Sequence, residues 1–185
     1  NDSLLTNLIS AVNPISSSIN YLSDSSGAIT CISSICSQKM IENAPLTYAS
    51  SKAALDRYVK NSAFYLAKKN IRINAVSPGN VFFNGSVWEK KMVQNKAGVL
   101  KMLKEKVPLN KFVLPDDIAE AVAFLSSPLS RSTTGQILSV DAGQLINWLI
   151  IYLKKYCNII HFRYFKIFAG LPPIRQFDGN FLFTR

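Results

Sequence analysis

Apolar positions along the chain follow two alternating patterns. Helical spacing of apolar residues, or a proline and acidic pair at a helix start, predicts helices over residues 3–22, 46–69 and 116–126. Short apolar runs rich in β-branched residues predict buried strands over 28–32, 71–76 and 136–140. Buried apolar strands that alternate with helices are typical of a parallel sheet with helical crossovers. The pattern therefore predicts an α/β fold with a small, doubly wound parallel sheet.

The ends of these segments refine the prediction. Asp2 or Ser3 is expected to cap the first helix, because short polar side chains satisfy the free N–H groups there. Asp116 and Asp117 begin the last helix, where a negative charge interacts favourably with the helix dipole. Residues 80–112 show no clear period and are expected to form an irregular, partly helical excursion.

The composition limits the class of protein. The length of 185 residues favours one domain, and an apolar fraction of 48% is enough for a packed core. The three cysteines form no CxxC pair, and His161 is the single histidine. This cysteine and histidine usage argues against a zinc site and favours a reduced protein of the cytoplasm.

Positive charge is concentrated toward the carboxyl end. The chain has 21 Lys and Arg against 11 Asp and Glu, a formal charge of +10. Residues 1–144 hold 15 basic and 10 acidic side chains, whereas residues 145–185 hold 6 and 1. Neither an aromatic platform of the RNA-binding type nor a zinc-finger spacing accompanies this charge. The sequence therefore predicts no nucleic-acid partner.

The last segment departs from the alternating pattern. Residues 145–153 are nearly all apolar, but a lysine pair ends the run far short of the ~20 residues that a membrane-spanning helix needs. Aromatic and basic residues are interleaved over 145–168. Three interpretations stay open: an interfacial helix at a membrane surface, a helix that covers the sheet, or a tail without a role. We divide the chain into a main unit, 1–143, and a basic, aromatic-rich extension, 144–185.

Two Tyr-x-x-x-Lys segments have the spacing for proton chemistry. On a helix, residues i and i+4 share a face, so the Lys52 ammonium would lie beside the Tyr48 phenol. A cation there favours the phenolate and helps a tyrosine to exchange protons near neutral pH. Tyr65 and Lys69 have the same spacing. For either pair, a solvated helix face is the alternative interpretation.

Sequence context favours the first pair. Ser34 precedes Tyr48 by 14 residues and ends a predicted strand, at the edge of a parallel sheet where ligands bind. Small residues around Tyr48 would also let a flat ligand approach closely. Tyr65 lies between Phe64 and Leu66 and is expected in the core.

Five segments resemble the short-chain dehydrogenase/reductase family in order and spacing. They are ITCISS (29–34), YASSKAAL (48–55), IRINAVSPG (71–79), LPDDIAEAVAFL (114–125) and TGQILSVDAG (134–143). The resemblance covers about residues 5–143 and implies a partial Rossmann-like sheet, the last three strands of that fold with their helices. It also implies an oxidoreductase that moves a hydride between NAD or NADP and a small carbonyl or alcohol substrate.

The resemblance implies a role for each matching residue. Tyr48 would be the general acid/base, and Lys52 would hold the nicotinamide ribose. Ser34 would bond the substrate oxygen. Asn7, 27 residues before Ser34, would support the proton relay, with an ordinary polar helix residue as the alternative.

A further group would form the wall of the cofactor site. Pro78, Gly79 and Val81 would lie against the nicotinamide. Phe83 stands where the family often has a threonine that touches the cofactor. Residues 84–111 would bind substrate, and a core role is the equal alternative for the apolar side chains expected there: Trp88, Met92, Leu100 and Leu103.

The family's glycine-rich turn that holds the cofactor phosphates has no counterpart, because GxGxxG does not occur. We therefore expect the catalytic, carboxyl-terminal part of the fold. The alternative is a truncated, non-catalytic remnant of the family, associated with a membrane through its extension. The resemblance further implies a homo-oligomer that pairs through the helices at 3–22 and 46–69.

Overall fold

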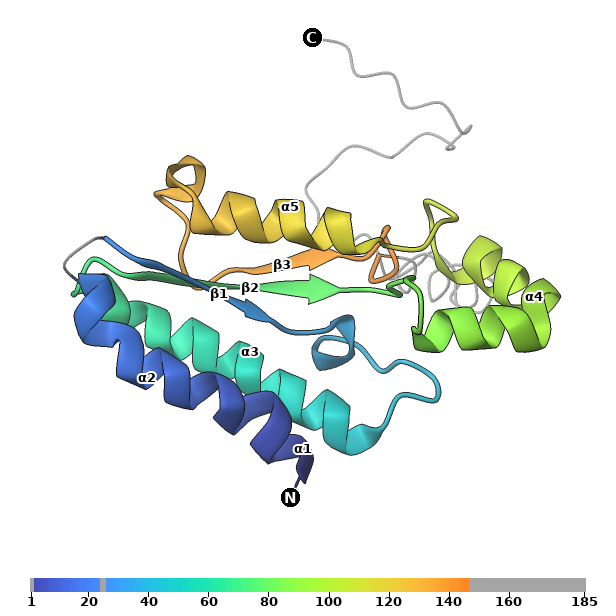
Figure 1. Ribbon diagram of the computed structural model, residues 1–185, viewed down its shortest axis with the longest axis horizontal. Coiled ribbons are helices and arrows are strands. Elements are labelled where there is room, and N and C mark those ends of the chain that lie inside the picture. Colours follow the sequence, from blue (N-terminus) through green and yellow to red (C-terminus); the bar gives the residue numbers. More distant parts are fainter. Residues whose placement is uncertain (1, 24–25, 147–185) are drawn as a thin grey trace, which may run out of the picture. The chain divides into compact units, whose positions relative to one another are not determined.

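The structure is a computed structural model that describes residues 2–23 and 26–146 (Figure 1). Helices and strands alternate in it as predicted, and every predicted strand and helix end lies within two residues of the observed one. The elements in chain order are α1 (Asp2–Leu4), η1 (Leu5–Ile9), α2 (Ser10–Ser23), β1 (Ala28–Ile32), η2 (Ile35–Ser37), α3 (Leu46–Ala67), β2 (Arg72–Pro78), α4 (Val87–Lys106), α5 (Pro115–Ser126), η3 (Pro128–Ser130) and β3 (Ile137–Val140).

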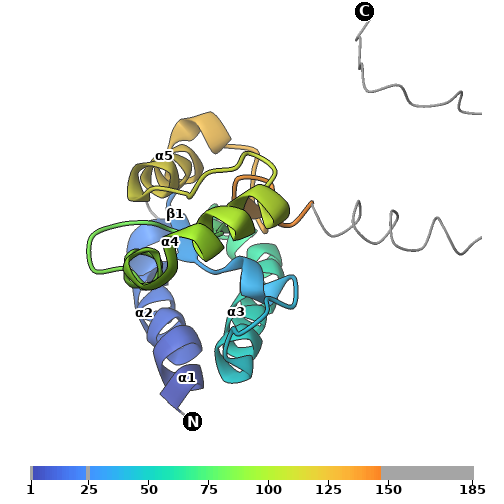
Figure 2. The same ribbon diagram turned by 90° about the vertical axis from the view of Figure 1, so that its right-hand side faces the viewer.

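The three strands form one parallel sheet in the order β1–β2–β3. In its register, Ala28 pairs with Arg72, and Ala75 pairs with Ile137. The central strand β2 is buried along all of its length except Arg72, as expected for a parallel strand with both faces covered. Helices α2 and α3 lie on one face of the sheet and α5 on the other (Figures 1 and 2). The predicted α/β class is confirmed.

The main core lies between the sheet and the α2–α3 layer. Helix α3 directs apolar side chains at helical spacing toward the strands, and β1 and β2 supply the facing residues. The buried members are Ile15, Cys31, Leu55, Val59, Ala63, Leu66, Ile71, Ile73 and Ala75. This packing fixes the position of α3 against β1 and β2.

The expectation that Tyr65 lies in the core was wrong. Its side chain is 67% exposed, and its ring packs edge-on against the equally exposed Phe64 at 5.4 Å. Successive residues on a helix are rotated by about 100°. Leu66 is therefore buried against the sheet, whereas its two predecessors face outward.

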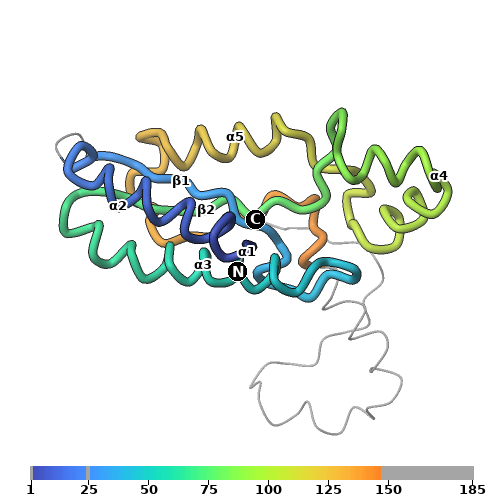
Figure 3. The backbone as a smooth tube through the Cα atoms, turned by 60° about the horizontal axis from the view of Figure 1, so that its bottom comes forward, coloured from blue at the N-terminus to red at the C-terminus, as the bar shows by residue number. Residues whose placement is uncertain are grey.

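The expected cap of the first helix was also wrong. Asp2 and Ser3 both lie inside the first turn, and residues 5–9 continue it as a wider π-helical turn before α2. The Ser3 hydroxyl donates instead to Thr47 Oγ1 at 3.2 Å. This contact joins the start of the first helix to the start of α3, which run alongside each other (Figure 3).

One guanidinium group joins the end of the sheet where the strands begin to the end of α5. Arg72, the first residue of β2, reaches the carboxyl end of α5 and the turn that follows it. Its donors bond to Leu125 O at 2.9 Å, Ser130 Oγ at 2.9 Å, Ser127 O at 3.1 Å and Thr133 O at 3.3 Å. A cation suits this place because the last carbonyls of a helix have no partners within the helix.

Among residues 2–23 and 26–146, no helix has both the length and the apolar content to cross a membrane. The predicted extension at 144–185 lies outside the described residues apart from its first three positions. The segment 145–168, for which an interfacial helix was one of three open interpretations, lies outside the described residues apart from its first two positions.

Candidate functional site

The predicted site residues gather at the carboxyl edge of the sheet. Ser34 lies two residues after the end of β1, Pro78 ends β2, and Tyr48 lies in the first turn of α3. The strands point toward the side of the molecule where η2, the start of α3 and the excursion around α4 are found (Figures 1 and 3). This edge is where open parallel sheets bind their ligands.

Ser34 is buried, with 8% of its surface exposed. Its backbone is extended, and its hydroxyl oxygen accepts a hydrogen bond from the Cys36 N–H at 3.2 Å, which caps the short helix η2. A hydroxyl that accepts in this way keeps its own proton for donation. Ser34 can therefore donate to an oxygen placed at the sheet edge.

Tyr48 and Lys52 share one face of α3, as their spacing predicts. The Lys52 Nζ atom lies 5.9 Å from the centroid of the Tyr48 ring. The same ammonium donates to the backbone carbonyl of Ile32, the last residue of β1, at 2.8 Å. Burial lowers the pKa of Lys52 below its usual value, while the charges of Cys31 and Asp56 act in the opposite direction.

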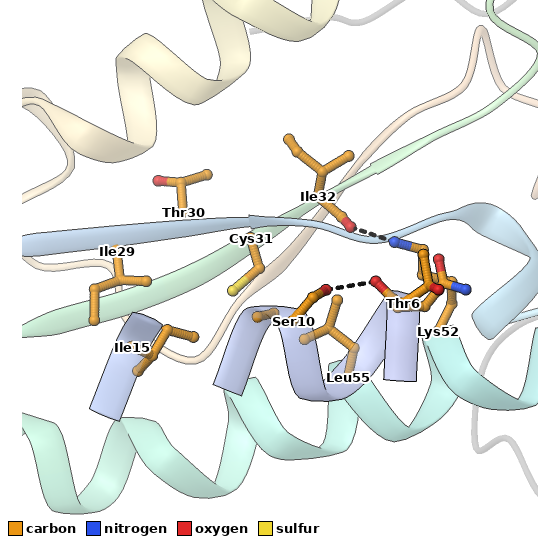
Figure 4. A pocket seen from close by; sticks show the side chains of 11 residues that line it. Thr6, Ser10, Ile15, Ile29, Thr30, Cys31, Ile32, Lys52 and Leu55 are labelled. Atoms are coloured by element: carbon orange, nitrogen blue, oxygen red, sulfur yellow. Dashed lines mark hydrogen bonds between the residues drawn. The ribbon is translucent and has the colours of Figure 1, made fainter. Parts of the chain in front are cut away.

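A pocket of about 310 Å³ opens beside Lys52, between the first helix and β1 (Figure 4). Asn7 lines this pocket together with Lys52, and its side-chain amide donates to Ser3 O at 3.0 Å. The structure thus brings two of the predicted catalytic residues into one cavity. Ser34 and Tyr48 are not among the residues that line it. The full lining consists of Thr6, Asn7, Ser10, Ala11, Ile15, Ile29, Thr30, Cys31, Ile32, Lys52 and Leu55.

The predicted nicotinamide wall is shaped by backbone packing. The Gly79 N–H donates to Val140 O at 2.9 Å, and a Cβ atom on Gly79 would lie 2.8 Å from the Cα of Asp141. Glycine is needed here because the ends of β2 and β3 approach so closely. Val81 forms a parallel bridge with Val113, which ties the wall to the segment before α5. A role for these residues as a wall against a cofactor stays a prediction.

The excursion after β2 is mostly the helix α4, kinked at Asn95. Phe83 is exposed before it. Of the side chains expected to line a substrate pocket, Leu103 is buried and Leu100 is exposed. Trp88 is half-buried, with its ring 5.5 Å from that of Phe112, and Met92 is half-buried as well. Substrate contact by these four side chains stays a prediction.

Two residues of this region were not predicted from the sequence. Asp56 is buried in α3 and accepts a hydrogen bond from the Ser37 hydroxyl at 2.5 Å. Asp56 follows Lys52 by four residues, so helical spacing placed it on the same face as Tyr48 and Lys52. That spacing could have predicted Asp56 from the sequence. No sequence pattern predicts Ser37, because it reaches Asp56 only through the path of the loop after β1.

The chain therefore has a partial Rossmann-like α/β fold, with a tyrosine, a lysine and a serine at the edge of the sheet where such folds bind ligands. A family model described as enoyl-(acyl carrier protein) reductase matches residues 1–144. The chain belongs to the short-chain dehydrogenase/reductase family.

Individual relatives agree with this assignment. The 7alpha-hydroxysteroid dehydrogenase of Escherichia coli K12 is 39% identical over 120 residues, which are 63% of this chain and 44% of that protein. An oxidoreductase of the short-chain dehydrogenase/reductase family from Burkholderia thailandensis has a similar structure, with a TM-score of 0.72 and 31% identity. That match covers 86% of this chain and 60% of the other.

A third relative has a cofactor in its structure. The short chain dehydrogenase from Leptospira borgpetersenii, solved with bound NAD+, has a TM-score of 0.64 and 29% identity over 75% of this chain and 53% of that one. The chain spans about half the length of the curated relatives it matches.

Proposed function

We propose that the Tyr48–Lys52 site transfers a hydride between a nicotinamide dinucleotide, NAD or NADP, and a small carbonyl or alcohol substrate. The observation that carries the proposal is the Lys52 ammonium, which lies beside the Tyr48 ring at the sheet edge that Ser34 also occupies. The family's dehydrogenases and reductases support it. The activity is proposed for the whole protein, since the relatives are longer than the matched part.

The donor set suits the ribose of the nicotinamide. An ammonium group has three N–H donors, and Lys52 gives one of them to Ile32 O. Lys52 is half-buried, and its other two N–H donors could form hydrogen bonds with the ribose hydroxyls. When bound, the dinucleotide supplies or receives the hydride.

The other side chains of the site account for the proton that is transferred together with the hydride. During reduction, the Tyr48 hydroxyl gives its proton to the substrate oxygen, and during oxidation it takes that proton back. Ser34 donates a hydrogen bond to the same oxygen and so stabilises the charge that develops there. The positive charge of Lys52 stabilises the phenolate that remains. Asn7, in the pocket that Lys52 lines, supports the path of the returning proton.

Steady-state turnover of the full chain and of Tyr48→Phe tests this proposal. The assay follows NADH and NADPH oxidation at 340 nm with a panel of steroid, sugar and small aliphatic carbonyl compounds. Loss of the positioned acid should lower kcat by about 10²- to 10⁴-fold. Tyr65→Phe is the matched control, because Tyr65 has its own lysine at i+4, Lys69, but lies on an exposed face of α3. This variant should keep full activity. Full turnover by Tyr48→Phe would contradict the proposal.

We further propose that the protein pairs with a second copy through the outer face of α2 and α3. Large aromatic side chains are exposed on these helices: Tyr21 at 82%, Phe64 at 66% and Tyr65 at 67%. Pairing of these helices with those of a second copy would remove the exposed rings from water, which supports the proposal.

A further inference from the structure

Asp56 is a carboxylate in an unfavourable place. Its residue is only 7% exposed, and its Oδ1 atom has no hydrogen-bond partner among the described residues. Burial of a carboxylate costs free energy unless hydrogen bonds or an opposite charge compensate. A buried polar atom without a partner calls for an explanation from its surroundings.

The other carboxylate oxygen ties α3 to the backbone that carries Ser34. The Ser37 hydroxyl lies between two acceptors, Asp56 Oδ2 at 2.5 Å and the backbone carbonyl of Ser34 at 2.6 Å. One helical turn earlier, Lys52 holds the carbonyl of Ile32 at 2.8 Å. The two attachments therefore bracket the end of β1, where Ser34 must be placed relative to Tyr48.

Asp56 also affects the pKa of Lys52. Burial alone lowers the pKa of this lysine, and the nearby Asp56 and Cys31 oppose the shift. Burial raises the pKa of the Cys31 thiol to about 11, so near neutral pH this thiol carries no charge. Tyr48 is the remaining titratable neighbour on α3. The first helix presents no charged side chain to the pocket: its lining residues there are Thr6, Asn7, Ser10, Ala11 and Ile15.

We propose that Asp56 is a positioning residue: through Ser37 it holds the backbone of Ser34, and it places a negative charge one helical turn from the Lys52 ammonium. Its consequence for catalysis rests on the proposed function, whereas its effect on Lys52 exists in the folded chain with or without turnover. The two effects can be separated, because Ser37 transmits the first and the carboxylate charge produces the second.

The charge effect is measured without any activity. The full chain and Asp56→Asn are acetylated with trace acetic anhydride across a range of pH, and the reactivity of each lysine is read by peptide mass spectrometry. Removing a negative charge disfavours the protonated amine, so Lys52 should become reactive at lower pH in Asp56→Asn. Lys60, exposed further along α3, is the internal reference. Asp116→Asn, at the exposed start of α5, is the control variant and should leave Lys52 unchanged.

The positional effect is measured by kinetics. Ser37→Ala removes the bridge without altering charge, so it should lower kcat roughly ten- to a hundredfold while KM changes by less than about twofold. Lys52 should titrate as in the wild type. In Asp56→Asn the fall in kcat should be joined by a shift of the alkaline limb of the pH profile to lower pH, and Asp56→Glu should restore part of the activity. Ser18→Ala, a helix serine bonded only within its own helix, is the control for Ser37→Ala.

The outcomes are distinct. If the wild type turns over no substrate while Lys52 still shifts in Asp56→Asn, the proposed function fails and the electrostatic role of Asp56 stands. If Lys52 reacts identically in both proteins, the electrostatic role is overturned. If Ser37→Ala and Asp56→Asn keep the full kcat of an active wild type, the positioning role is overturned. Should Asp56→Asn not fold, Ser37→Ala and Asp56→Glu decide the matter by the same readouts.

Discussion

Replacing Arg72 with alanine tests how strongly this residue holds the sheet to α5, the helix on the face opposite to α2 and α3. The guanidinium donates to four acceptors, three of them backbone carbonyls, at 2.9 to 3.3 Å. Alanine leaves all four without that donor. Ser130 is fully buried, and its hydroxyl also bonds to Leu125 O, so part of this cluster cannot be reached easily by water.

The magnitude follows from the number and burial of these acceptors. A hydrogen bond from a charged donor contributes about 1.5–3 kcal/mol in favourable cases. One cation shared by four acceptors does not supply that amount four times, and water replaces it at the less buried carbonyls. We therefore expect Arg72→Ala to lower the free energy of unfolding by about 2–4 kcal/mol, within the range for a broken buried network.

Urea unfolding followed by circular dichroism measures the effect. Arg57→Ala removes an exposed arginine from α3 and is the control, expected to change stability by less than about 0.5 kcal/mol. Because Arg72 lies at the end of β2 opposite to the site, kcat of the folded variant should stay unchanged. A loss no larger than that of Arg57→Ala would refute the view that this guanidinium holds α5 to the sheet.

Two other expectations concern the thiols and the oligomer. At pH 8 a thiol of pKa about 11 is only about one part in 10³ thiolate, so iodoacetamide should modify Cys36 well before Cys31, as peptide mass spectrometry would show. Equal rates in the folded chain would mean that Cys31 is not buried as described. Light scattering should give the mass of two or more chains, and Phe64→Asp should reduce it to that of one chain. A wild-type mass of one chain would contradict pairing through α2 and α3.

The parts of the fold that could be predicted are those set by local pattern. The strands were found because parallel strands buried on both faces are mostly apolar, as in β2, where Asn74 and Ser77 are the polar residues among those buried from Ile73 to Pro78. The Tyr48–Lys52 pair was found because helical spacing alone brings i and i+4 together. Both signals lie within a few residues of sequence.

The parts that could not be predicted depend on contacts between distant segments. Ser37 and Asp56 meet across 19 positions because a loop returns to α3, and no local pattern encodes that path. Ser3 was expected as a cap, yet its hydroxyl bonds Thr47 across the interface of two helices. Tyr65 was assigned to the core because its neighbours in the sequence are apolar. Burial on a helix depends instead on which face a residue occupies, and Tyr65 is on the exposed face.

Isotope transfer from the cofactor to the product tests whether Tyr48 supports hydride transfer at this site. The full chain is incubated with a reducible carbonyl compound and NADH or NADPH carrying deuterium at the transferable C4 position. Mass spectrometry of the alcohol product should show one deuterium on the former carbonyl carbon with the wild type and Tyr65→Phe, and almost none with Tyr48→Phe. Absence of labelled alcohol with the wild type, or its undiminished formation by Tyr48→Phe, would contradict the account.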